Sequence, residues 1–231
     1  MRTSKRIPSA ITLWQRHEEL ILEVFWGALE LLCQESVLPE EEDDISEILS
    51  VKIRKANFKL NDHGRGLTCL PIWQGQIAPA TETEVGSSFT GKKPDFQCQC
   101  KNESAQNAEE AYISYCIECK RLGKTMGSGW NLNKNYVQEG ILRFLTVEHS
   151  YGKDAGSGTM IGYVQNMDFD SILKEVNQNI AQVQTHKIPL IEFPATQPAS
   201  KEIINITQKF NRTKVGPSVF NLRHIWVDLR R

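Results

Sequence analysis

The clearest helical pattern in the chain covers residues 10–35. Its polar side chains recur at three- and four-residue steps, which places them on one stripe of an α-helix. These polar positions are Arg16, Glu19, Glu23, Glu30 and Gln34. The remaining positions are mostly apolar, so we expect that face to be buried. Pro39 ends the pattern, and the acidic run that follows at residues 40–44 is predicted to be a solvated loop.

Two later segments alternate between apolar and polar positions, which is typical of β-strands. In the first, one face carries Phe96, Cys98 and Cys100, and the other carries Asp95, Gln97 and Gln99. In the second, the apolar face consists of Ile113, Tyr115, Ile117 and Cys119. Glu118 and Lys120 then share the opposite face with Cys116. The alternation therefore predicts that one carboxylate and one amine lie side by side on a strand.

The other elements are read from the same periodicities. Residues 134–148 are predicted to form a helix whose inward side chains are Val137, Ile141, Phe144 and Leu145. A strand over 158–164, a helix over 169–183 and a strand over 219–229 follow. Residues 45–60 fit a helix or a strand, and this choice stays open. Gln197–Ser200, with prolines nearby, is the expected linker to a C-terminal extension. Helices that alternate with strands predict an α/β fold with a mixed sheet.

Length and composition predict a single domain over residues 1–231, with a core over about 10–166 and an extension over 167–231. The chain is 40% hydrophobic and carries 27 Lys and Arg against 28 Asp and Glu, so contact with a polyanion would need locally clustered bases. No apolar run of about 18 residues is present to cross a bilayer, and no signal-peptide core is found near the start. We therefore expect a cytoplasmic protein without a membrane partner, whose six cysteines are reduced.

One set of charged residues has the composition of a catalytic site. Pro94-Asp95 is followed, after 22 residues, by Glu118-Cys119-Lys120. Two carboxylates are hard oxygen ligands that suit Mg²⁺, which keeps waters and takes substrate phosphate as a further ligand. Lys120 beside the cation could orient or deprotonate an attacking water. In the alternative interpretation, Asp95 caps a turn and Glu118 and Lys120 are an exposed strand pair.

This constellation resembles the PD-(D/E)XK nuclease superfamily, the restriction-endonuclease-like fold, over roughly residues 10–166. The resemblance implies a helix, a three-stranded meander, a crossover helix and a fourth strand around a mixed central sheet. It implies a Mg²⁺- or Mn²⁺-dependent endonuclease that hydrolyses DNA, with Asp95, Glu118 and the backbone carbonyl of Cys119 on the metal and Lys120 as a catalytic residue. Residues 136–144 and 158–164 resemble members encoded beside prokaryotic restriction and antiphage systems, so a homodimer or a defence-system partner protein is a further expectation.

The resemblance also implies a catalytic glutamate from the first helix. Glu19 and Glu23 lie on the polar stripe, whereas Glu18 shares its face with Trp14 and Phe25, so Glu18 is the expected fourth catalytic residue. The alternative that Glu18 pairs with a nearby Lys or Arg stays open. The bases that flank the constellation are expected to contact phosphates of the nucleic acid. These bases are Lys93, Arg121, Lys124 and Arg143.

Two other functions remain possible from the sequence. The first is a nucleic-acid-binding or assembly subunit that keeps the fold without cutting, although such a subunit need not retain Asp95, Glu118 and Lys120. The second is a zinc-stabilised interaction module built on Cys98, Cys100, Cys116 and Cys119. Strand parity opposes the zinc module, because it places Cys116 and Cys119 on opposite faces.

Overall fold

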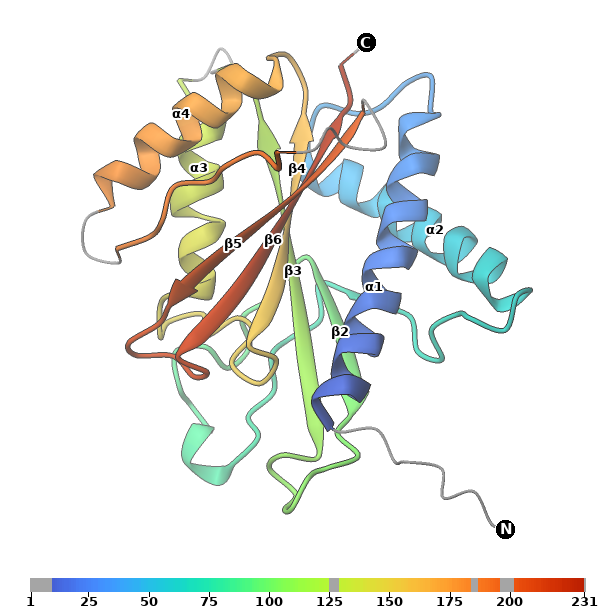
Figure 1. The fold of residues 1–231 in the computed structure, drawn as a ribbon, viewed down its shortest axis with the longest axis vertical. Coiled ribbons are helices and arrows are strands. Elements are labelled where there is room, and N and C mark those ends of the chain that lie inside the picture. Colours follow the sequence, from blue (N-terminus) through green and yellow to red (C-terminus); the bar gives the residue numbers. More distant parts are fainter. Residues whose placement is uncertain (1–9, 125–128, 184–186, 196–201, 231) are drawn as a thin grey trace.

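A six-stranded mixed sheet with helices on both faces forms the centre of the molecule (Figure 1). The computed structural model describes residues 10–124, 129–183, 187–195 and 202–230. The strand order is β1-β2-β3-β4-β6-β5, in which β3, β4 and β6 are parallel and the remaining neighbours pair antiparallel. The expected α/β class with a mixed sheet is therefore confirmed.

One face of the sheet is covered by α1 (Ala10–Cys33) and α2 (Glu42–Asn61) (Figure 1). The first helix agrees with its prediction. The second resolves the ambiguity over residues 45–60, because Ile45, Leu49 and Ile53 are buried at helical spacing.

The prediction that residues 40–44 form a solvated loop is wrong in part. Glu42, Asp43 and Asp44 form the first turn of α2. Carboxylates are favoured there because the helix dipole places partial positive charge at the N-terminus.

The antiparallel meander consists of β1 (Ile72–Trp73), β2 (Phe96–Lys101) and β3 (Tyr112–Leu122), with a 3₁₀ turn, η1 (Glu82–Glu84), between β1 and β2. The strand β3 extends beyond the end of β2, because their pairing stops where Phe96 lies opposite Ile117. Beyond that point β3 pairs with β4 on its other side only. The last residues of β3 therefore have an open edge, which must find its hydrogen bonds elsewhere.

The opposite face of the sheet is covered by α3 (Leu132–Gln138) and α4 (Phe169–Gln182) (Figure 1). The continuous helix predicted over 134–148 is wrong: α3 ends at Gln138, and the separate 3₁₀ turn η2 (Ile141–Phe144) follows. Gly140 lies at the break, and a Cβ there would come within 2.4 Å of the Tyr136 carbonyl oxygen. The inward side chains remain buried as predicted, because both pieces pack on the sheet.

The C-terminal part of the chain completes the same sheet. The strands β4 (Ser157–Val164) and β6 (Val219–Asp228) agree with their predicted ranges, as does α4. The edge strand β5 (Ile203–Asn211) was not predicted from the sequence. Because β6 pairs with β4, the segment after residue 166 is part of the central sheet. The expected linker Gln197–Ser200 lies outside the described residues.

A buried arginine ties this C-terminal hairpin to η2. Arg212 is 3% exposed, and its guanidinium donates to the carbonyl oxygens of Phe144 (3.1 Å), Tyr151 (3.0 Å) and Gly152 (3.2 Å). It also lies 4.0 Å from the centre of the Phe220 ring. Burial lowers the pKa of Arg212 to about 10. These bonds fix the turn in which Arg143 lies.

Among the helices that the structure describes, none is both long and apolar enough to cross a membrane.

Candidate active site

Two carboxylates cap the open edge of β3. The backbone N–H of Cys119 donates to Asp95 Oδ2 at 2.6 Å, and the N–H of Arg121 donates to Glu42 Oε2 at 3.0 Å. Asp95 directly precedes β2, and Glu42 begins α2. Beyond the end of β2, the carboxylates of Asp95 and Glu42 therefore accept the hydrogen bonds of the β3 backbone that a neighbouring strand would otherwise accept.

Lys120 lies at the centre of this group. Its ammonium is 2.6 Å from Glu42 Oε1, 2.7 Å from the Cys119 carbonyl oxygen and 2.9 Å from Glu118 Oε1. Only 10% of the side chain is exposed. Burial alone would lower the pKa of Lys120, but the neighbouring carboxylates outweigh it and hold the pKa above its ordinary value. Lys120 is thus a protonated donor in this arrangement.

Glu118 is the most deeply buried acid of the group. Its side chain is 1% exposed, and Oε1 accepts from Arg143 Nη1 at 2.5 Å. Its second oxygen, Oε2, is buried without a hydrogen-bond partner. A carboxylate oxygen left in this state costs free energy unless a donor or a cation reaches it.

The electrostatics of the two core carboxylates follow from burial. Desolvation, and then the nearby Asp95, raise the pKa of Glu118 to about 8. Desolvation raises the pKa of Asp95 to about 6, against the opposing pull of Lys120. A raised pKa means that these acids attract positive charge, because a bound cation would relieve the same desolvation as a proton.

A cleft of about 380 Å³ opens beside this group. It is lined by Glu42, Lys120, Arg121, Trp130, Leu132, Asn135, Glu139 and Arg143. We refer to it below as the Lys120 cleft. Its residues come from α2, the end of β3 and the segment of α3 and η2, so it lies where the open edge of β3 meets both helical layers.

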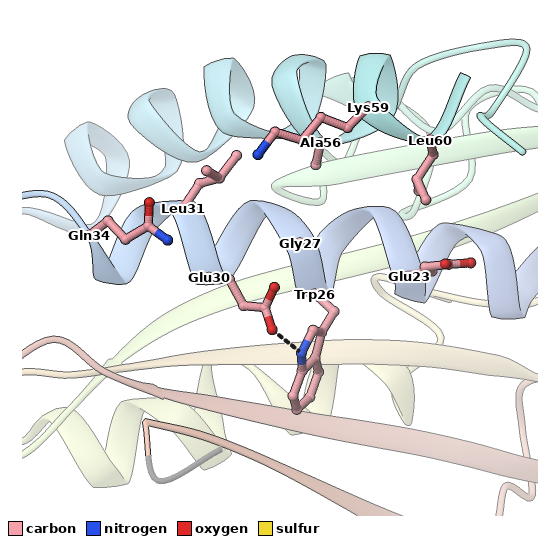
Figure 2. Close-up of a pocket in the computed structure, with 9 residues that line it drawn as sticks. All are labelled: Glu23, Trp26, Gly27, Glu30, Leu31, Gln34, Ala56, Lys59 and Leu60. Carbon is pink, nitrogen blue, oxygen red and sulfur yellow. Dashed lines mark hydrogen bonds between the residues drawn. The ribbon is translucent and has the colours of Figure 1, made fainter. Parts of the chain in front are cut away.

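A second groove, of about 420 Å³, lies between α1 and α2 on the outer side of the molecule (Figure 2). Its carboxylates have partners at the surface: Glu23 pairs with Arg65 at 2.7 Å, and Glu30 accepts from Trp26 Nε1 at 3.0 Å. The buried Glu118, with one unpartnered oxygen, lies instead beside the Lys120 cleft and contacts Lys120 and Arg143 of its lining. We therefore assign the candidate active site to that cleft.

The sequence-predicted residues separate into two groups. The structure brings together Asp95, Glu118, Lys120, the Cys119 carbonyl and Arg143. Glu118 and Lys120 share a face of β3 as predicted. Arg121 lines the cleft, although its guanidinium donates to the Glu40 carbonyl at 3.0 Å.

Lys93 and Lys124 are exposed and do not line the cleft. Their assignment as phosphate contacts stays a prediction.

Glu18 is not part of this group. Its carboxylate accepts from Ser157 Oγ at 3.2 Å and lies 3.6 Å from Arg223 Nε. These partners lie beside Tyr115, whose ring packs in the core on the α1 side of the sheet, whereas Glu118 faces Arg143 on the α3 side. The structure thus places Glu18 apart from the group around Lys120 and near an arginine, which is the alternative that the sequence left open.

Glu42 is the functional candidate that the sequence reasoning missed. It was grouped with the acidic run, yet only 24% of its side chain is exposed and it contacts Lys120. The available signal was its place in the first turn of a helix, directly after Pro39 and two further acids. That signal does not reveal the contact, because Glu42 and Lys120 are 78 residues apart.

No group of three or more His, Cys, Asp or Glu side chains in the described residues is arranged to hold a metal ion. The four cysteines of the zinc alternative are free thiols that the fold does not gather. Cys98 and Cys119 lie in the core beneath α1 and α2, and Cys116 lies in the core on the other face.

Comparison of the chain with protein-family models, with curated proteins and with solved structures gives no match.

Proposed function

We propose that the protein is a metal-dependent nuclease that hydrolyses phosphodiester bonds in DNA at the Lys120 cleft. The observation that carries this proposal is the buried pair of Asp95 and Glu118 beside Lys120, with Glu118 Oε2 left unpartnered. A buried acid with a vacant lone pair next to an ammonium is costly in a purely structural role.

The donors present fit a hard divalent cation. Asp95, Glu118 and the Cys119 carbonyl would each offer an oxygen ligand near the end of β3, and Mg²⁺ needs only one or two carboxylates because it keeps waters and takes a substrate phosphate. The unpartnered Glu118 Oε2 is a ready ligand atom. When bound, Mg²⁺ or Mn²⁺ would supply Lewis-acid stabilisation of the charge that develops on phosphorus and would activate a water.

The chain's own residues supply the rest of the chemistry. Lys120 donates hydrogen bonds as an ammonium and orients the attacking water, and Glu42 holds Lys120 in place at 2.6 Å. Arg143, which donates to Glu118 Oε1, would be available to bind a phosphate oxygen of the substrate. Burial of the group strengthens each of these interactions.

The finer fold assignment also belongs to this proposal. The order of the meander β1-β2-β3, the α3 crossover and the parallel strand β4 is compatible with a restriction-endonuclease-like core. A setting in prokaryotic restriction or antiphage defence is supported by the sequence resemblance alone.

The direct test is cleavage of plasmid, single-stranded DNA and RNA in the presence of Mg²⁺. Asp95→Asn keeps the shape of the side chain and an acceptor for the Cys119 N–H, but it removes the charge. We expect cleavage to fall by at least about a hundredfold, since even outer partners of a metal site contribute 10- to 100-fold. Asp43→Asn, on the exposed side of the same group of acids, is the control and should cleave normally. Undiminished cleavage by Asp95→Asn would place the active site elsewhere.

A further inference from the structure

An exposed tryptophan lies in the wall of the Lys120 cleft. Trp130 is 57% exposed and shortly precedes α3, on the same cleft as Lys120 and Arg143. An exposed indole costs solvation free energy, which a flat partner on its face would recover. Lys120, Arg121 and Arg143 line the same cleft, together with the carboxylates of Glu42 and Glu139.

Unpartnered polar atoms are concentrated at the same place. In the part of the chain that the structure describes, five buried side-chain atoms lack a hydrogen-bond partner; two belong to residues that line this cleft, and a third belongs to Glu118, which contacts Lys120 and Arg143 of its lining. These three are Glu118 Oε2, Asn135 Nδ2 and Arg143 Nε. The acceptor, Glu118 Oε2, would serve the proposed cation, but the N–H groups of Asn135 Nδ2 and Arg143 Nε remain without acceptors. Buried donors are normally satisfied, so their clustering points to a ligand that brings acceptor atoms.

We propose that the Lys120 cleft holds one nucleobase that is out of its duplex stack, next to the phosphodiester that is cut. Trp130 stacks on the face of the base, the Asn135 amide donates to an acceptor on its edge, and Arg143 donates to the adjoining phosphate. This inference rests on the proposed nuclease function and names its substrate class: single-stranded DNA, or DNA with a displaced base.

The dimensions favour this ligand over an intact duplex. A cleft of about 380 Å³ is within the range of sites for one small ligand, whereas a duplex would need an extended surface. Both faces of a base in a duplex are covered by its neighbours, so an indole can stack only on a base that has left the stack. Asn and Arg are common donors to the acceptor edges of bases and to phosphates.

Binding without catalysis is the first experiment. A fluorescently labelled oligonucleotide is titrated with the protein in a chelator, and single-stranded and duplex forms of one sequence are compared by anisotropy. We expect single strands to bind at least about tenfold more tightly than the duplex, and Trp130→Ala to remove roughly tenfold of that affinity. Trp130→Phe keeps an aromatic face and should retain most of it. Phe58→Ala, which removes an aromatic ring that is 67% exposed on α2, is the matched control and should bind as the wild type does.

The outcomes separate this inference from the proposed function. We call the proposed stacking of a nucleobase on Trp130 the base platform. If the protein cuts duplex and single strands equally and Trp130→Ala leaves both rates unchanged, the base platform is wrong while the nuclease function is supported. If no cleavage occurs with any metal but single strands bind through Trp130, the platform stands and the nuclease fails. Equal binding of an RNA strand supports the platform, since it recognises the base rather than the sugar. Wild-type affinity of Trp130→Ala for single strands overturns it.

Discussion

At the scale of single residues, the site depends on how Glu118 is buried. One of its oxygens contacts Arg143 and Lys120, and the other is buried without a hydrogen-bond partner. Truncating one partner of a buried ion pair leaves a charge uncompensated, which is costly. Lys120 and Arg143 therefore stabilise the buried carboxylate of Glu118, and its Oε2 remains available to bind a ligand.

The contrast between Glu42 and Glu18 gives a prediction about catalysis. Glu42→Gln removes the charge that holds Lys120, so we expect cleavage to fall by about 10- to 100-fold. Glu18→Gln removes only the contacts with Ser157 and Arg223, so cleavage should stay within about twofold of the wild type. Cleavage assays under single-turnover conditions measure both. A larger loss in Glu18→Gln than in Glu42→Gln would restore Glu18 to the active site.

At the scale of elements, the break between α3 and η2 positions the cleft. Because the helix stops at Gln138, the chain turns at Gly140 and passes close to the stem of Lys120. A Cβ at Gly140 would lie 3.3 Å from Lys120 Cγ and 2.4 Å from the backbone oxygen of Tyr136. Arg212 then fixes the end of η2 through the Phe144 carbonyl. The position of Arg143 is thus set by two neighbours rather than by helical continuity.

Gly140→Ala tests this arrangement. The added methyl meets backbone, which cannot yield cheaply, so we expect a loss of about 1–3 kcal/mol in the free energy of unfolding together with slower cleavage. Gly27→Ala is the matched control: its Cβ would lie 3.5 Å from Ala56 Cβ, an ordinary contact inside α1. That change should stabilise the protein by up to about 1 kcal/mol. Urea denaturation checks both. A Gly140→Ala protein as stable as the wild type would show that the break is not sterically required.

The same comparison shows what periodicity could and could not predict. Helices α1 and α4 follow from local patterns because each presents one regular apolar face to the core, and β3 follows from alternation. Strand β4 follows from a short apolar run that is buried on both faces of the sheet. The placement of Glu118 with Lys120 follows from strand parity alone. The contact of Glu42 does not, since it joins segments distant in sequence. The predicted helix over 134–148 is too long, because the helical spacing of apolar residues continues past Gly140 although the α-helix itself ends at Gln138.

At the scale of the whole molecule, the missed edge strand β5 has a physical explanation. Its inward positions include Ile206 and Phe210 but also Gln208, which is 3% exposed. An inward polar side chain interrupts the alternation by which a strand is recognised. Gln208 is buried because it accepts from His224 Nε2 at 3.2 Å and donates to the Pro189 carbonyl at 2.6 Å.

This glutamine belongs to a buried chain of hydrogen bonds on the α3 side of the sheet. Trp226 Nε1 donates to the Tyr136 hydroxyl at 3.0 Å, and that hydroxyl lies 2.8 Å from His224 Nδ1. Gln208 Oε1 is the atom that faces His224 Nε2, and an amide oxygen can only accept, so Nε2 is the protonated nitrogen; Nδ1 of the neutral ring then accepts from the Tyr136 hydroxyl. Every donor is matched with an acceptor only while His224 is neutral, so the network links β5 and β6 to α3 in one protonation state.

The neutral His224 makes stability depend on pH. Burial lowers its pKa to about 3, against 6.5 for an ordinary histidine. Below pH 6.5 the histidine binds a proton in the unfolded chain but stays neutral in the folded protein. The free energy of unfolding therefore falls by up to about 1.4 kcal/mol for each pH unit. Between pH 7 and pH 5 the wild type should lose about 2 kcal/mol more than His224→Gln, whose side chain does not titrate.

Urea denaturation of the wild type, His224→Gln and His63→Gln at the two pH values measures this difference. The raised pKa values of Asp95 and Glu118 act in the opposite direction, since the folded protein binds their protons more readily. They are present in all three proteins and cancel in the comparison. His63→Gln replaces an exposed histidine outside this network and is the control for the substitution itself. Identical pH dependence in the wild type and His224→Gln would mean that His224 is protonated in the folded protein, and the direction of the Tyr136–His224–Gln208 hydrogen bonds would have to be reassigned.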